Sequence, residues 1–173
     1  MPTALYRFLL SLVLLLPVIA HAGDASDFAA ASSSQQAALL ERWSAEPDAA
    51  RLPLLEALQQ GRVAADSNKA AFIEIDGVYQ PADGTAAPAE APRKLRLNNR
   101  LRGLIATAVA SHQLLAEDPA LRLAAAQQLQ KSAKPEQLAL LNARVTAEQD
   151  DSVRDALSLA LPNYCQVLEE ASR

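Results

Sequence analysis

Two short stretches in the second half of the chain, Asp118-Pro119-Ala120-Leu121-Arg122 and Asp150-Asp151-Ser152-Val153-Arg154, decide the fold. In each, an aspartate leads, an aliphatic residue follows three positions later, and an arginine comes next. The second stretch begins 32 positions after the first. Aliphatic and small residues then recur at helical spacing in both copies: Leu121, Ala124, Ala125 and Leu129 against Val153, Ala156, Leu157 and Leu161. A period in the thirties is typical of stacked helix pairs. The repeat therefore predicts an all-α fold of HEAT-like α-hairpins.

The flanks of these stretches predict the neighbouring helices. Aspartate is a preferred N-cap and proline a preferred first helical residue, so we expect Asp118 and Pro119 to begin a helix that continues over residues 121–131. Pro135 begins the next helix, through Val145. Asp150 or Asp151 then caps a last one that ends at Leu161, before Pro162.

The first half of the chain carries a weaker copy of the pattern. A first helix is expected over residues 27–46, with Trp43 as a core anchor. A second begins at Pro47-Asp48, and its Arg51, Leu54, Leu55 and Leu58 match Arg122, Ala125, Ala126 and Leu129 at an offset of 71, about two repeats. Gly61 is placed to end that helix.

Residues 62–96 interrupt the helical pattern. The segments 71–75 and 78–80 alternate like strands, and Asp76-Gly77 between them is a strong signal for a two-residue hairpin turn. A loop rich in proline and alanine follows over residues 81–92. An isolated hairpin is marginally stable in water, so we expect it to lie on the helices or on a partner. A long helix over residues 97–116 then resumes the array.

The N-terminus resembles an export signal. Arg7 precedes an apolar run over residues 8–20, and Ala20-His21-Ala22 supplies a cleavage pattern before Gly23. The run of about 13 residues is short against the roughly 20 needed to span a bilayer. We expect export to the periplasm or to the periplasmic face of the inner membrane, with an uncleaved anchor as the alternative. The domains are thus a signal peptide (1–22), a HEAT-like domain with an insertion at 62–96 (23–161), and a divergent tail (162–173).

Composition narrows the function. The chain has 16 Lys and Arg against 20 Asp and Glu; without Arg7 of the signal, 15 against 20 leave a net charge of −5. This acidity argues against nucleic-acid binding. Aromatic residues are only 4% of the chain, so leucine, alanine and valine must build most of the core.

The residues that usually carry chemistry are sparse. His112 is the only histidine after the signal, and Cys165 is the only cysteine, either free or paired with another chain. We expect His112 at the surface or at an edge, and no metal, cofactor or catalytic site. The adjacent carboxylates Asp150-Asp151 and Glu169-Glu170 do not face each other on a helix, so they are read as caps or solvated groups.

One charged cluster allows two interpretations. Positive charge at a helix N-terminus opposes the helix dipole, so basic residues there call for a reason. The cluster could be a docking patch for an acidic partner or an anionic lipid surface; alternatively, it is solvated or paired with Glu74, Asp76 and Glu90. Its members precede and enter the helix over residues 97–116: Arg93, Lys94, Arg96, Arg100 and Arg102. Arg122 and Arg154, by contrast, are read as braces between repeats.

The strings Leu97-Asn98-Asn99-Arg100-Leu101-Arg102 and DPALRLAAA (118–126) together resemble the N-terminal extracytoplasmic region of the urea ABC transporter permease, in the branched-chain amino acid permease group. The resemblance covers roughly residues 40–161. It implies a signal-like start, a HEAT-like region with a β insertion, and then a membrane-spanning permease. The 173 residues contain no such permease part, as in a truncated or excised domain.

From the resemblance we expect an accessory domain that contacts a membrane permease or a substrate-binding protein. It touches the membrane only through the permease part or an uncleaved signal. The transport residues of the family lie in the permease, so none is assigned here. The alternative is a stand-alone periplasmic HEAT-like adaptor; an enzyme fits the sequence least.

Overall fold

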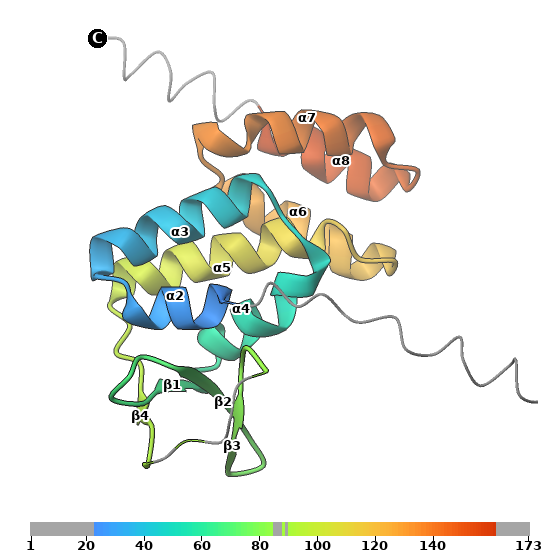
Figure 1. The fold of residues 1–173 in the computed structure, drawn as a ribbon. Helices are drawn as coiled ribbons and strands as arrows, with labels where there is room; N and C mark the ends of the chain where they lie inside the picture. Colours follow the sequence, from blue (N-terminus) through green and yellow to red (C-terminus); the bar gives the residue numbers. More distant parts are fainter. Residues whose placement is uncertain (1–22, 85–87, 89, 162–173) are drawn as a thin grey trace, which may run out of the picture.

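The computed structural model describes residues 23–84, 88 and 90–161. The predicted signal peptide (1–22) and tail (162–173), together with Cys165 and Glu169-Glu170, lie outside these residues. Most of the described chain is helical, and a small antiparallel sheet is inserted near its middle. The sheet lies at one end of the molecule and helices α7 and α8 at the other, with α2 to α5 between them (Figure 1).

The first helix of the sequence prediction is two helices in the structure, α2 (Asp24–Ala30) and α3 (Ser33–Ala45). The break falls at Ser32, whose side chain accepts from the backbone N–H of Gln35 while the Gln35 side chain accepts from that of Ser32. This capping box ends one helix and begins another. Trp43 of α3 is buried, as expected, with its ring 5.9 Å from that of Phe28.

The second helical segment begins with a 3-10 turn, η1 (Ala49–Arg51), capped by Asp48, and continues as α4 (Leu52–Gln59). Gly61 follows with a φ of 66°, which glycine adopts without strain. The N–H of Arg62 donates to the carbonyl of Ala57, and the N–H of Gly61 to that of Leu58. This pattern is a Schellman motif, and it confirms the glycine stop predicted from the sequence.

The insertion contains four strands rather than the predicted single hairpin: β1 (Val63–Ala65), β2 (Ala71–Ile75), β3 (Val78–Pro81) and β4 (Arg93–Lys94), in the order β3-β2-β1-β4. All neighbours are antiparallel. The hairpin turn forms where predicted, because Asp76 and Gly77 both take positive φ. Strands β1 and β4 escape the sequence pattern because they are two or three residues long, and one is all basic.

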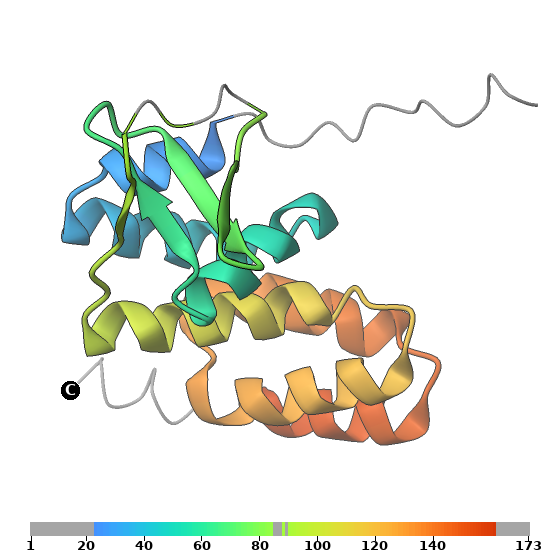
Figure 2. The ribbon, with the colours of Figure 1, turned by 90° about the horizontal axis from the view of Figure 1, so that it is seen from below.

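The sheet is anchored on helices α2 and α4 (Figures 1 and 2). Val63 and Ala71 lie in the helical core, whereas Phe72 is buried outside that core cluster. The hydroxyl of Ser26 in α2 accepts from the N–H of Ala71. The insertion is therefore integral to the N-terminal half of the molecule.

Two helix pairs complete the chain. Helix α5 (Asn99–Gln113) pairs with α6 (Pro119–Ser132); after the 3-10 turn η2 (Pro135–Gln137), α7 (Leu138–Ala147) pairs with α8 (Asp151–Ala160). Helix α8 also packs on α6, so the second pair stacks on the first. The predicted caps are present: the Asp118 side chain accepts from the N–H of Ala120, and that of Asp150 from Val153.

The repeated arginines occupy equivalent positions. Arg122 donates to the carbonyl of Ala116, six residues earlier, and Arg154 to that of Glu148, also six residues earlier. Arg122 also donates to the Glu148 carboxylate of the next helix pair, so its predicted role as a brace between repeats is confirmed. The bonds of Arg154 stay within its own pair, at Glu148 and Asp151, so for Arg154 that role was wrong.

The buried faces of α6 and α8 do not follow the 32-residue offset of the caps. Ala125, Ala126 and Leu129 of α6 correspond in burial to Ala156, Leu157 and Ala160 of α8, an offset of 31. Leu121, predicted to face the core, is exposed. The reason is packing: α6 lies between α5 and α8, whereas α8 contacts α6 and α7.

Two hydrophobic clusters form the core. The N-terminal cluster extends from Ala25 to Val109, and the C-terminal cluster from Ala110 to Ala160. Helix α5 contributes to both, because Leu101 and Ile105 lie in the first and Ala110 in the second.

Candidate functional site

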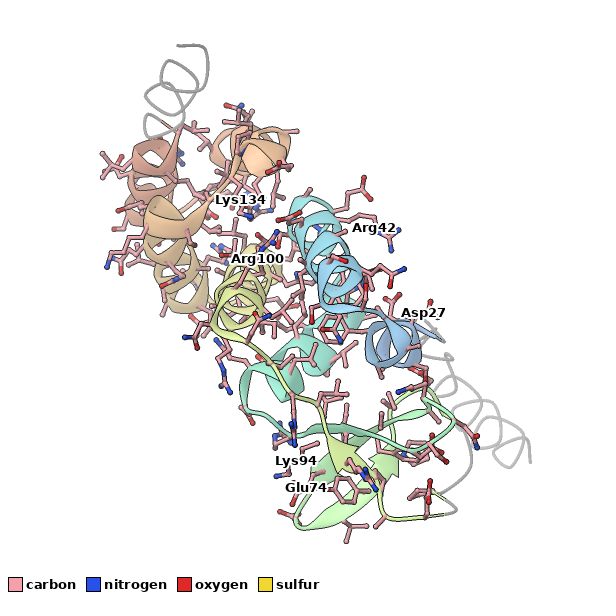
Figure 3. The ribbon with its side chains drawn as sticks, turned by 90° about the vertical axis from the view of Figure 1, so that its left-hand side faces the viewer. Asp27, Arg42, Glu74, Lys94, Arg100 and Lys134 are labelled. Atoms are coloured by element: carbon pink, nitrogen blue, oxygen red, sulfur yellow. The ribbon has the colours of Figure 1, made fainter. Side chains whose placement is uncertain are left out.

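The basic cluster lies where the sheet leads into helix α5. Arg93 and Lys94 form β4, Arg96 lies in the connection, and Arg100 and Arg102 lie in the first turn of α5. All five residues are exposed. Figure 3 shows Lys94, Arg100 and also Lys134 following one another from the sheet towards the C-terminal helices. We call the five arginine and lysine residues the basic patch.

The start of α5 is fixed locally. The side chain of Asn98 accepts from the N–H of Leu101, so the helix begins at Asn99 rather than at the expected residue 97. No acidic residue lies in its first turn, where Arg100 and Arg102 face the positive end of the helix dipole. The patch therefore opposes helix stability instead of supporting it.

Part of the patch is paired with acidic groups. Lys94 Nζ lies 2.7 Å from Glu74 Oε2, and the hydrogen bond that Lys94 donates to Glu74 raises the pKa of Lys94. Arg100 reaches Glu41 only at 3.9 Å, and Glu41 is bound more closely by Lys134 at 2.8 Å. Thus one of the expected acidic partners in the insertion, Glu74, forms an ion pair with the basic patch.

The other three members of the basic patch have fewer polar contacts. Arg102 donates to the carbonyl of Leu97 at 3.3 Å. Arg93 and Arg96 form no ion pair with any described residue. Glu90 instead accepts hydrogen bonds from Ser67, which lower its pKa, and Arg93 acts on it only as a weaker, more distant charge. Three of the five cations are thus without a described carboxylate partner: Arg93, Arg96 and Arg102.

A concavity of about 540 Å³ runs along β4, between the end of α2 and the turn that joins β1 to β2. Its charged lining includes Lys69, Arg93, Lys94 and Arg96 on the positive side. Its two carboxylates are already used: Asp66 accepts from the N–H groups of Asn68 and Ala70, and Glu90 from that of Ser67. These carboxylates keep their charge, but the four cations of the lining outnumber them, so the concavity presents net positive charge to a ligand.

The sequence pattern did not indicate Lys69 as part of this site. Lys69 has a φ of 68°, unusual for a residue with a side chain, within the turn that Asp66 closes. The nearest signal was the Asp66-Ser67-Asn68 run, whose residue types favour turns.

His112 is buried, at 1% exposure, so its expected place at the surface was wrong. Its Nδ1 lies 2.8 Å from the carbonyl of Ala108, and its buried Nε2 has no partner in the described structure. Burial lowers the pKa of His112 to about 4. The error arose because a single histidine on an alanine-rich helix carries no periodic signal for its face.

Two other concavities lie away from the patch. One, of about 620 Å³, lies between α2 and α3, with Asp27 and Arg42 on its rim (Figure 3). The other, of about 630 Å³, follows the groove between α6 and α8 and exposes Leu159. Ser152 and Asp155 both line the second concavity, but no hydrogen bond joins their side chains. Within the described residues, no three His, Cys, Asp or Glu side chains gather as metal ligands would.

Among the helices of the described chain, none is both long and apolar enough to cross a membrane. Compared with protein-family models, with curated protein sequences and with solved structures, the chain gives no significant match.

Proposed function

We propose that this chain is a docking domain on the periplasmic side of the inner membrane, serving an ABC transporter of the urea permease type. The observation that carries the docking role is the basic patch. A chain with net negative charge places five exposed cations within ten residues, and three of them lack a described carboxylate partner. Charge of this kind steers an acidic partner.

The transport context comes from the resemblance of residues 97–102 and 118–126 to the extracytoplasmic region of the urea permease. The order of elements agrees with it: helices, a β insertion, the capped helix α5, and then repeated pairs. In this proposal α5–α6 and α7–α8 are HEAT-like repeats. Their matching aspartate caps and arginine bonds support that assignment.

Photo-crosslinking in cells tests this function. A crosslinking amino acid replaces Arg96 or Arg100, and the captured proteins are identified by mass spectrometry. We expect a substrate-binding protein or a permease subunit of an ABC transporter. The double reversal Arg96→Glu with Arg100→Glu abolishes capture by crosslinkers at neighbouring exposed positions. Arg42→Glu is the matched control, because Arg42 is an exposed arginine on α3, outside the patch. If the double reversal leaves capture intact, the patch is not the docking surface.

A stand-alone periplasmic adaptor is the second candidate, since the same surface could serve it. The DNA downstream of codon 173, translated in all three forward frames, separates the two. A polytopic hydrophobic frame supports the permease assignment, and an unrelated gene with its own start supports the adaptor.

A further inference from the structure

Strand β4 is an edge of the sheet, and no other strand of the described chain pairs with its outer side. The N–H of Leu95 donates to the carbonyl of Val63, which sets Leu95 opposite Val63 in a hydrogen-bonded pair. In antiparallel sheets the backbone groups of alternate residues point to opposite sides. The N–H and C=O groups of Lys94 and Arg96 therefore point away from β1, and neither N–H has a partner among the described residues. An extended chain could add there.

The side chains beside this edge indicate which kind of peptide segment could bind to it. The concavity described above follows β4 and is lined by Lys69, Arg93 and Arg96, none of which forms an ion pair with a described carboxylate. Lysine at an edge can also serve to prevent pairing. Here, however, the amine of Lys94 is held by Glu74 on its own sheet. The backbone of Lys94 is thus left accessible beside a positive surface.

The opposite edge, on β3, differs. Pro81 of β3 has no N–H to offer, and proline is a common way to block an edge. Two of the exposed side chains on that hairpin, Ile75 and Val78, are apolar, and no cation lies on either of its strands. The β3 edge therefore serves as an internal comparison for the β4 edge.

We propose that β4 receives an extended acidic segment of the partner protein as a fifth strand of the sheet. Main-chain hydrogen bonds to Lys94 and Arg96 supply affinity, and the cations at positions 69, 93 and 96 select acidic side chains. This inference rests on the proposed docking function and specifies its chemistry.

Fluorescence anisotropy of the full chain with a short labelled peptide, in which glutamate alternates with valine, tests this. We expect binding that weakens about tenfold when the peptide is N-methylated along one edge, since about two hydrogen bonds are lost. The N-methylated peptide leaves the protein unaltered, so misfolding cannot explain the loss. Hydrogen exchange then shows protection of the Lys94 and Arg96 amides by the unmethylated peptide, with no change at Tyr79 on β3.

Variants complete the test. Arg93→Glu with Arg96→Glu weakens peptide binding about tenfold or more, while Arg42→Glu leaves it unchanged. Binding that is indifferent to N-methylation, or protection at β3 instead of β4, overturns the strand addition. So does binding of anionic phosphatidylglycerol vesicles without binding of the peptide. If crosslinking to a transporter subunit persists while the peptide fails, only the strand addition is wrong; if both fail, the docking function is wrong.

Discussion

Helix α5 packs into two cores that are built from different side chains. The N-terminal core contains Phe28 and Trp43 and closes against a sheet. The C-terminal core contains only alanine, leucine and valine among its described members. Because aliphatic helices have little to distinguish one packing from another, the C-terminal half needs polar contacts to fix its geometry. Glu148 supplies them.

Glu148 joins the last three helices at one buried carboxylate. Its side chain is 2% exposed and accepts two hydrogen bonds from Arg122, at 2.8 and 2.9 Å. It also accepts from the N–H groups of Gln149 and Asp150, and its own carbonyl accepts from Arg154. The N-terminal half therefore adds two aromatic rings to an otherwise aliphatic core, whereas the C-terminal half has an aliphatic core beside one buried, hydrogen-bonded carboxylate.

The largest effect is expected from Trp43. Trp43→Ala removes the indole from its contacts with Phe28 and with the guanidinium of Arg51, which lies 5.2 Å from the ring centre. We expect a loss of about 4 kcal/mol in the free energy of unfolding, measured by urea denaturation. Trp43→Phe is the control and should cost much less, since the indole N–H has no hydrogen-bond partner to lose. Equal losses in the two variants would contradict a core organised by ring size.

The next effect is expected from Glu148→Gln, which leaves the partly buried guanidinium of Arg122 without its carboxylate. Breaking a buried pair at one partner costs about 3 kcal/mol. Hydrogen exchange should accelerate in α7 and α8 more than in the sheet. Asp151→Asn is the matched control: its pair with Arg154 is exposed and should contribute less than about 1 kcal/mol. If hydrogen exchange accelerated equally in both halves, a role of Glu148 confined to the C-terminal half would be contradicted.

The third effect is a dependence on pH that arises where the two cores meet. Burial, with a smaller contribution from Arg51, lowers the pKa of His112 from 6.5 to about 4, while Asp48 and the carbonyl of Ala108 act the other way. Folding thus favours the neutral ring. The stabilisation is complete above pH 6.5 and is lost as the pH falls towards 4, by about 2 kcal/mol between pH 7 and pH 4.5.

His112→Gln should reduce this slope, as followed by urea denaturation at several pH values. The pKa of Glu148 is lowered to about 2, chiefly by Arg122, so its contribution is lost at lower pH, between 4.5 and 2. Glu148→Gln should therefore alter the profile only in that lower window. An unchanged slope between pH 6.5 and 4 in His112→Gln would show that other groups titrate there.

The features that the sequence predicted are local ones. Asp118 and Asp150 cap helices, and Gly61 and Asp76-Gly77 shape turns, because these residue types bond or bend within a few positions of themselves. Strand β4 could not be predicted in this way, since its two basic residues become a strand only by pairing with β1, about thirty positions earlier.

In the candidate site, too, the local features could be predicted from the sequence and the long-range features could not. The exposure of Arg93, Arg96 and Arg100 follows from their charge and their spacing. The concavity beside them, and the place of Lys69 in it, depend on how the β1–β2 turn lies against residues 90–96. The burial of His112 was also a long-range outcome, because the packing around α5 determines which of its faces is covered.

The connection between β4 and α5 has a mechanical consequence. Only residues 95–98 separate the strand from the helix, and both leucines among them, Leu95 and Leu97, pack on the N-terminal core. Because this linker is short and its leucines are packed, it has little slack to take up a displacement of β4 relative to α5. We therefore expect a pull on the edge of the sheet to reach α5, which among the described helices is the one with residues in both cores. Under such a load at β4, we expect the two cores to move together rather than as two hinged parts.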